Sequence, residues 1–369
     1  MAEIQQPKTP QSVPQNVPQK DTQSSKSSKS MATVKTPSPV KKHFKTKSDL
    51  GNHWFKLIVD GYEEPLRIPS YLAPCSDMSG DILGHVKYLS GDCQGLIGQC
   101  WLVGTQAYRA SMSDTQITST RLVEEYNGKS DLWLQYFLGA IAHLPTINSE
   151  QIHTVSVSCN DVKRHKDVIK AYEGTHTVEL RGQKATIQIK IASIVPEGYG
   201  AIKVHGLSGD VTLCDIGGGN VTVSQFSNAN LIATPSVADF GVDYLLKGLM
   251  ADSELKRLIN QPPSEYVLTK SLETGYKSVK PKGATESQTV LYYGTTGIDI
   301  YPVYIRLLND FIKCKFAPIG KRLAEAQNLN EKVLVIGGGS KLPGLRGILV
   351  KKGFIVSDKG VFANVEGLD

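Results

Sequence analysis

The sequence predicts an α/β protein built of two similar halves. Two predicted strands each end in an aspartate that is followed by a glycine-containing turn and a second strand, at residues 49–52 and 215–220. A third glycine turn, near residue 337, follows a short apolar strand and precedes a helical segment. Helical patterns separate these units, and no repeat of roughly 20–50 residues is evident, so a solenoid is excluded.

Length and composition exclude several other classes of protein. Of 369 residues, 40% are hydrophobic and 21% are charged, which rules out fibrous and wholly disordered chains. We find no apolar run of about 18 residues and no signal-peptide core, so we expect a soluble, cytoplasmic protein without a transmembrane segment. Six cysteines without a C-x-x-C pair argue against a disulfide framework or a zinc site.

The N-terminal segment differs from the rest of the chain in charge and composition. Residues 1–48 hold nine lysines against only Glu3 and Asp21, so they carry the excess behind the net charge of +6. We expect residues 1–42 to form a disordered basic tail, because they contain too little apolar surface to offset the entropy of ordering. Such a tail is either a tether to a membrane, nucleic acid or acidic partner, or a solubilising extension, and Met31 is a second candidate start.

Strand patterns dominate the first half of the ordered chain. Residues 54–69 read as two strands joined at Asp60-Gly61, a dipeptide that favours a hairpin. Apolar residues at helical spacing predict a helix over 131–143. Further strands are predicted, from alternating or β-branched residues, over 100–104, 153–159, 175–180 and 185–195.

The second half combines strands with longer helices. Residues 211–226 predict a strand, a glycine turn and a strand, whereas 331–349 predict a strand, a glycine turn and a helix. Apolar periodicity predicts helices over 240–250, 252–259 and 302–316, the last with Pro302 in its first turn, where proline is tolerated.

The aspartate-containing turns carry the chemical signal. Neither a Walker A motif nor a Rossmann G-x-G-x-x-G motif is present. In the two units, glycine lets backbone N–H groups approach phosphate oxygens, and the aspartate at the strand end offers a hard oxygen ligand for hydrated Mg²⁺. A single turn of this kind is usually an ordinary β-turn, so the repetition is what makes the pair informative.

In combination, these motifs resemble the actin-like ATPases, the superfamily of actin, the DnaK-type chaperones, the sugar kinases and ParM. The segments DLGNHWFKLIVDG, RIPSYLAP, WLVGTQAY, IVPEGYGA, CDIGGGN and VIGGGSKLPGL are most similar to the ParM/StbA branch, over about residues 44–358. The resemblance implies a two-lobed fold of duplicated ribonuclease-H-like domains, each on a mixed five-stranded sheet, with a nucleotide cleft between the lobes. It places the first lobe at 43–208, the second at 209–358 with an inserted subdomain near 250–300, and a C-terminal tail at 359–369.

The resemblance also assigns roles to individual residues. Asp49 and Asp215 would orient Mg²⁺ through water, and Lys56 would reach the nucleotide phosphates. Glu197 would position the hydrolytic water, and all three acidic residues count as catalytic. The remaining residues would bind the nucleotide: Gly51 and Asn52 in the first phosphate turn, Gly217, Gly218, Gly219 and Asn220 in the second, and Gly337, Gly338, Gly339 and Ser340 in a purine and ribose turn.

Two of these residues also have an ordinary structural interpretation. Lys56 fits a solvated strand lysine, and Glu197 fits a surface residue of a proline- and glycine-containing turn. One segment departs from the family pattern: the strand before Asp49 is KKHFKTKS, with four lysines, where a buried apolar strand is usual. We therefore expect that strand to be short or to lie at the sheet edge.

The implied function is a filament-forming ATPase that polymerises with bound nucleotide, for plasmid or DNA segregation or for a derived cytoskeletal role in cell shape. Its cofactors would be ATP or GTP with Mg²⁺. Its partners would be further copies of itself in a head-to-tail filament and a DNA-binding adaptor protein, with an acidic partner for the basic tail. The alternatives are a small-molecule kinase of the same fold that does not polymerise, and a nucleotide-gated binding scaffold.

Overall fold

The computed structural model describes residues 41–78, 80–113, 120–121, 130–280 and 285–369. The chain divides into two units, residues 1–38 and 39–369, and all described residues belong to the second. The predicted basic tail, residues 1–42, therefore lies almost wholly outside the described residues. Its last residue, Lys42, already begins the first strand.

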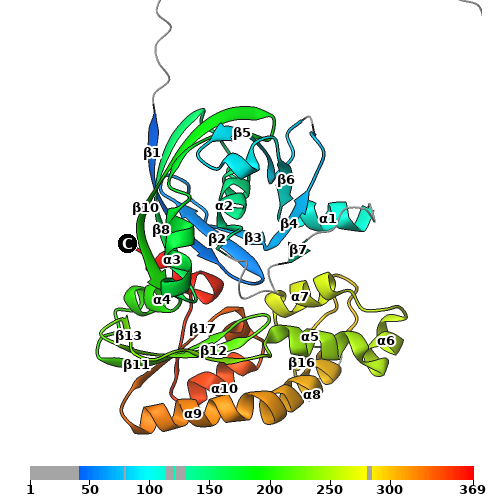
Figure 1. Cartoon of the computed structure of the whole chain (residues 1–369). Coiled ribbons are helices and arrows are strands. Elements are labelled where there is room, and N and C mark those ends of the chain that lie inside the picture. Colours follow the sequence, from blue (N-terminus) through cyan, green and yellow to red (C-terminus); the bar gives the residue numbers. More distant parts are fainter. Residues whose placement is uncertain (1–40, 79, 114–119, 122–129, 281–284) are drawn as a thin grey trace, which may run out of the picture. The chain divides into compact units, whose positions relative to one another are not determined.

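The first lobe is built on one large mixed sheet (Figure 1). Its strand order is β3-β2-β1-β8-β10-β9-β5-β6-β4-β7, in which β1, β8 and β10 run parallel and the other pairs are antiparallel. The strands are β1 (Lys42–Leu50), β2 (Trp54–Val59), β3 (Leu66–Pro69), β4 (Tyr71–Pro74), β5 (His85–Gly91), β6 (Cys100–Val103), β7 (Thr120–Arg121), β8 (Glu150–Cys159), β9 (Gly174–Leu180) and β10 (Gln183–Pro196).

This sheet is larger than the five strands that we expected. The long strand β10 pairs with β8 on one side and with β9 on the other, and a bulge between Ile191 and Ser193 shifts its register with β8. Strand β9 then pairs with β5, which carries the ladder on to β6, β4 and β7. The extension arises because β9 and β10 form a hairpin whose outer edge remains open for pairing.

The expectation that the lysine-rich strand is short or at the edge is wrong. β1 spans nine residues and pairs with both β2 and β8, so it lies inside the sheet. Its alternation explains this position: Thr46 and Ser48 are buried on one face, whereas Lys45 and Lys47 point to the other. The Lys47 ammonium donates a hydrogen bond to the backbone oxygen of Glu366, so even this cation has a partner.

Helix α2 (Trp133–Ile141) fills the concave side of the first sheet, within the range predicted for a helix. It is buried almost all round, and its Trp133 and Phe137 pack with strand residues such as Phe55 and Val157 in one apolar core. Two further helices belong to this lobe, α1 (Thr105–Ser113) and α3 (Val162–Lys170), with a 3₁₀ turn at Gln94–Leu96.

The second lobe has its own sheet and core. The strand order is β13-β12-β11-β17-β18, with β14 paired to β12, and a separate hairpin joins β15 and β16. Its strands are β11 (Asp210–Ile216), β12 (Val221–Ser227), β13 (Asn230–Leu231), β14 (Ser236–Ala238), β15 (Lys277–Val279), β16 (Gln288–Val290), β17 (Lys332–Ile336) and β18 (Ile355–Val356). The predicted α/β class, with a separate sheet in each of two lobes, is confirmed, and the β15–β16 hairpin adds a small third sheet.

Helices surround this second sheet. They are α4 (Tyr199–Val204), α5 (Val242–Ala251), α6 (Ser253–Ile259), α7 (Glu265–Thr274), α8 (Tyr301–Phe311), α9 (Ala317–Asn328), α10 (Leu345–Lys351) and α11 (Ala363–Glu366), with 3₁₀ turns at Gly338–Lys341 and Gly360–Phe362. The predicted helix at 302–316 continues through a π-helical segment, Ile312–Phe316, into α9. Pro318 explains the irregularity, because it lacks the N–H that an α-helical bond requires.

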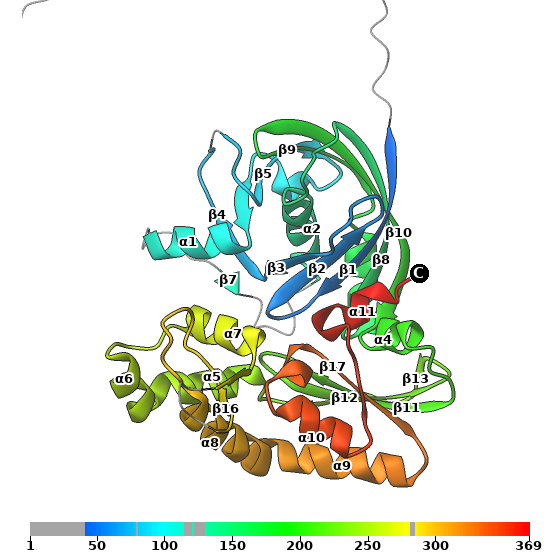
Figure 2. The ribbon, with the colours of Figure 1, turned by 180° about the vertical axis from the view of Figure 1, so that it is seen from behind.

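The C-terminal residues 359–369 are ordered, contrary to the tail that we expected. Helix α11 packs beside α4 and against β1, β2 and β8 of the first lobe, as both views show (Figure 2). Ala363, Val365 and Leu368 are buried, and their apolar contacts hold the segment in place. Within the described part of the chain, none of the helices is both long and apolar enough to cross a membrane.

Candidate functional site

A cleft of about 1570 Å³ lies between the two lobes. It is lined by the β1–β2 turn, the β11–β12 turn and the turn after β17, together with residues of α3, α5 and α7. The structure brings twelve of the predicted site residues to this cleft, namely Asp49, Gly51, Asn52, Lys56, Glu197, Asp215, Gly217, Gly218, Asn220, Gly337, Gly338 and Gly339.

In the first turn, strand register explains why Asp49 and Lys56 meet. The antiparallel ladder of β1 and β2 places residue 49 directly opposite residue 56, so a spacing of seven residues puts both side chains on one face. Lys56 Nζ lies 2.8 Å from Asp49 Oδ2. The turn backbone is held from the β3–β4 side, because the Ser70 hydroxyl donates to Gly51 O at 2.8 Å and the Ser70 N–H donates to His53 O at 2.9 Å.

Lys56 marks the electrostatic centre of the cleft. Burial works to lower its pKa, but Asp49, Asp215 and Glu197 outweigh burial and raise that pKa above its ordinary value. The ammonium is therefore charged and interacts with all three predicted carboxylates. Asp49 is almost fully buried, and its Oδ1 has no hydrogen-bond partner among the described residues. A buried carboxylate oxygen in this condition offers a ligand atom, because leaving it unsatisfied is costly.

The second turn is joined to the N-terminus of α5. The backbone N–H groups of Val242 and Asp243 donate to the carbonyl oxygens of Gly217 and Gly218, at 3.1 and 2.9 Å. A Cβ at Gly241 would overlap these carbonyls, so only glycine permits the approach. Within the turn, the Gly217 N–H donates to Asn220 O at 2.9 Å.

The third turn reaches the second through parallel pairing. Asp215 of β11 lies beside Ile336 of β17, so Gly337, which follows Ile336, is placed against the aspartate. A side chain at Gly337 would overlap Asp215 Oδ1, and the residue also has φ of 84°, which favours glycine. Ser340 does not line the cleft: it is fully buried, and its hydroxyl donates to Gly337 O at 2.7 Å. Gly219 is not among the lining residues either.

Glu197 lies in the turn between β10 and α4 and lines the cleft. Its backbone N–H donates to Cys159 O at 2.9 Å, which ties the turn to the end of β8. Gly198, the next residue, has φ of 97°, and a Cβ there would press on Phe226 and Leu213 of the second lobe. The backbone that carries the half-buried Glu197 carboxylate is therefore fixed by the hydrogen bond to Cys159 and by the packing of Gly198.

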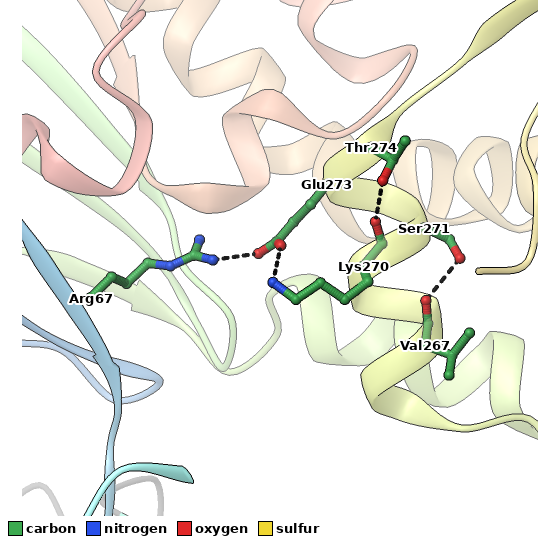
Figure 3. Close-up of polar contacts among 6 residues, drawn as sticks. All are labelled: Arg67, Val267, Lys270, Ser271, Glu273 and Thr274. Atoms are coloured by element: carbon green, nitrogen blue, oxygen red, sulfur yellow. Dashed lines mark hydrogen bonds and ion pairs between the residues drawn. The ribbon is translucent and has the colours of Figure 1, made fainter. Parts of the chain in front are cut away.

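Sequence reasoning missed two contacts that cross the cleft. His53 in the first turn has its Nε2 2.8 Å from both carboxylate oxygens of Asp243 on α5. Because a carboxylate only accepts, the Nε2–H is the donor. The second contact joins Arg67 of β3 to Glu273 of α7 at 2.9 Å; Figure 3 shows the two side chains pointing toward one another. Lys270, on the same helix, also reaches Glu273.

Asn364 of α11 was missed as well, because the residues around it carry no motif. It lines the cleft and donates a hydrogen bond to Asp215. The sequence also carried no motif that pairs His53 with Asp243, or Arg67 with Glu273. His53 was inside a recognised turn, but a histidine in a turn says nothing about a partner 190 residues away.

Comparison with known proteins gives a family match over part of the chain and a fold match over most of it. Residues 48–200 match the family model for the actin like proteins N terminal domain. A Bacillus thuringiensis ParM hybrid protein with ADP, containing two ParM mutants, has a TM-score of 0.66 at 16% identity over 88% of this chain and 48% of that chain. This chain therefore spans about half the length of that hybrid.

Two further solved structures match this chain over almost their whole length. Bacillus thuringiensis ParM with ATP has a TM-score of 0.62 at 18% identity, over 88% of this chain and 96% of that one. The actin-like protein Alp7A has a TM-score of 0.62 at 15% identity, over 88% and 95%. A search of curated proteins finds no significant match. Residues 48–200 thus match the N-terminal domain of the actin-like proteins, and the described residues have a fold like that of ParM.

Proposed function

We propose that this protein is a filament-forming, Mg²⁺-dependent nucleoside triphosphatase that binds ATP, or GTP, in its cleft. One observation carries the proposal: Lys56 lies among Asp49, Asp215 and Glu197, where three glycine turns meet. A cation among carboxylates, beside glycine-containing turns, suits a phosphate chain with its metal. Bacillus thuringiensis ParM has been solved with ATP, with AMPPNP and with ADP, which supports the same ligand class here.

The residues of the cleft fit a nucleotide with Mg²⁺. The unpartnered Oδ1 of Asp49 and the carboxylate of Asp215 supply hard oxygen atoms. Gly51 and Gly337 let the turn backbone come close to Lys56 Nζ and Asp215 Oδ1, which a Cβ at either position would overlap. Among the described residues, no group of three or more His, Cys, Asp or Glu side chains gathers as a metal site. Mg²⁺ at nucleotide sites is usually held by one or two carboxylates with water and phosphate oxygens, and Asp49 and Asp215 are the two carboxylates offered.

The proposed chemistry assigns a separate task to each residue. Bound Mg²⁺ would neutralise charge on the phosphate oxygens. Lys56 would bind a phosphate oxygen through its ammonium, released in part from Asp49. Glu197 would orient the attacking water and accept its proton at a carboxylate oxygen, a role in which position matters more than basicity. The backbone N–H groups of the glycine turns would hold the phosphates in place.

Assembly would follow from nucleotide binding. Head-to-tail contacts that do not close generate open filaments, so one asymmetric pair of surfaces is sufficient. Within that proposal we place plasmid or DNA segregation through a DNA-binding adaptor, or a role in cell shape, in the cytoplasm. The basic tail would meet an acidic surface in such an assembly.

Negative-stain electron microscopy tests the proposal directly, with phosphate release measured in the same samples. We expect filaments with ATP and Mg²⁺, longer-lived filaments with a slowly hydrolysed analogue, and none without nucleotide. Asp215→Ala should abolish phosphate release, whereas Asp210→Ala, at the exposed far end of the same strand, should not. Phosphorylation of a small molecule without filaments would instead indicate a small-molecule kinase. Nucleotide binding with neither filaments nor phosphorylation would indicate a nucleotide-gated binding scaffold.

A further inference from the structure

Asn364 contacts two separate parts of the candidate reaction centre. It lies in α11 and is only 6% exposed. Its Oδ1 accepts a hydrogen bond from the backbone N–H of Gly198 at 2.9 Å, and its Nδ2 donates to Asp215 Oδ2 at 3.3 Å. Gly198 directly follows Glu197, so a single amide side chain connects the turn of the glutamate with the aspartate.

The amide side chain of Asn364 satisfies two partners of opposite character. The N–H of Gly198 can only donate, and an ionised Asp215 can only accept. The residue between them must therefore accept on one side and donate on the other. An aspartate at position 364 would still accept from Gly198, but it would set a second carboxylate against Asp215. An alanine would leave the buried N–H of Gly198 and the partly buried carboxylate of Asp215 without this contact.

The backbone around Asn364 is fixed by close packing. A Cβ at Gly200 of α4 would overlap the carbonyl oxygen of Asn364, and a Cβ at Gly367 would overlap Gly200 O. At the end of α11, Glu366 accepts a hydrogen bond from Lys47 through its backbone oxygen and pairs with Lys359 through its carboxylate. The amide of Asn364 is thus presented from a rigid support.

Asp215 is restricted on its other side as well. A Cβ at Gly337 would overlap Asp215 Oδ1, so the third glycine turn limits movement of that oxygen while Asn364 engages Oδ2. The rotation of the carboxylate is therefore limited by two elements that are far apart in sequence, the β17 turn and α11.

We propose that Asn364 is a positioning residue that fixes the Asp215 carboxylate relative to the Glu197 turn. This role rests on the proposed nucleotide hydrolysis. Asn364 does not itself act on the water or the phosphate; it determines where the metal-orienting carboxylate stands with respect to the base. Losing such an outer contact typically costs about 10- to 100-fold in metal affinity or activity.

The test compares nucleotide affinity with and without Mg²⁺, using a fluorescent ATP analogue, and follows turnover in parallel. Asp215 influences the affinity chiefly through the metal, so Asn364→Ala should reduce the gain in affinity that Mg²⁺ provides by about 10- to 100-fold. The affinity in EDTA should stay within about twofold of the wild type. The turnover number should fall by a factor similar to the loss in Mg²⁺ gain. In an Asp215→Ala background, Asn364→Ala should cause no further loss.

Val365→Ala is the matched control, because Val365 is fully buried in the same helix and does not line the cleft. It should lower stability and leave the Mg²⁺ gain intact. If Asn364→Ala does not fold, Asn364→Asp, which has nearly the same shape, takes its place and should lose the same gain. A normal Mg²⁺ gain in a folded Asn364 variant overturns the positioning role. A wild-type protein that binds no nucleotide overturns the proposed function, and this role with it.

Discussion

Where α4 meets α11, backbone lies against backbone, whereas the β1–β2 turn and strand β3 meet α5 and α7 through charged and polar side chains. The first contact is dry: Ala201, Ile202 and Ala363 are fully buried, and Gly200 and Gly367 allow the close approach. The second is wetter, since the side chains of Arg67 and Glu273 are 27% and 34% exposed. Moving tightly packed backbone segments apart costs packing free energy, whereas half-exposed side-chain pairs break and re-form at a small free-energy cost.

This difference suggests that the two sides of the cleft have different roles. Glu197, Asp215 and Asn364 are attached to the tightly packed side, where relative positions persist. The first phosphate turn borders the other side, where His53 and Arg67 reach across to the second lobe. We infer that the packed side maintains the chemistry and that the side-chain pairs govern opening for nucleotide exchange.

The largest expected effect comes from removing the proposed base on the packed side. Glu197→Ala should lower turnover by about 10² to 10⁴, the range for a positioned acid or base, because the attacking water loses the carboxylate that would orient it. Nucleotide affinity should survive, and filaments should persist. Phosphate release combined with light scattering measures both. Phosphate release and filament disassembly at wild-type rates would show that Glu197 is only a structural residue of the turn.

Gly200→Ala tests the packing itself. The added methyl group meets the backbone of Asn364, which cannot swing aside, so we expect a loss of about 3 kcal/mol in the free energy of unfolding. Urea denaturation followed by circular dichroism measures this quantity. Gly347→Ala is the control, because Gly347 lies in α10 with open space around it and should be neutral or gain about 0.5–1 kcal/mol. Equal stabilities of the two variants would contradict the comparison.

His53→Ala removes the more buried of the two cross-cleft contacts. Hydrogen bonds to charged groups contribute about 1.5–3 kcal/mol, so release of a fluorescent nucleotide should accelerate by about tenfold or more. Stopped-flow displacement measures the rate. The unfolding free energy should change less than in Gly200→Ala, since His53 and Asp243 are 16% and 17% exposed. Unchanged release would show that this pair does not resist opening.

Glu273→Gln should have the smallest effect. Exposed ion pairs contribute about 0.2–1 kcal/mol, so nucleotide release should accelerate by up to about fivefold. Lys270→Ala is the matched control, because Lys270 also pairs with Glu273 but from the same helix, and its loss leaves the cross-cleft contact in place. If both variants release nucleotide equally fast, the contact with Arg67 has no role in opening.

Local patterns in the sequence were sufficient for most elements and for the turns of the site. The helix predicted at 131–143 is present as α2, and the strands that flank Gly217–Gly219 appear where the sequence predicted them. The predicted hairpin of β2 and β3 is present as well, but its connection runs from residue 60 to residue 65 and is longer than Asp60-Gly61. The pairing of Asp49 with Lys56 could also be anticipated, because the two residues belong to one hairpin and its register follows from alternation.

Distant contacts could not be predicted in this way. No local pattern shows that β10 carries the first sheet onward through β9, or that a lysine-rich strand runs through its interior. The same is true of α11: an eleven-residue segment expected to be a tail instead places Asn364 beside Asp215, 149 residues earlier in the chain.

The sequence by itself therefore determined the α/β class, the three glycine turns and the residues at their ends, because turn chemistry and strand alternation act between near neighbours. Only the tertiary structure decided which carboxylates surround Lys56, which helix supports Asp215 and which side chains close the cleft. Those contacts depend on strand order and on the close approach of Gly200 and Gly367, and their free energy comes from burial that is complete only when distant segments pack together.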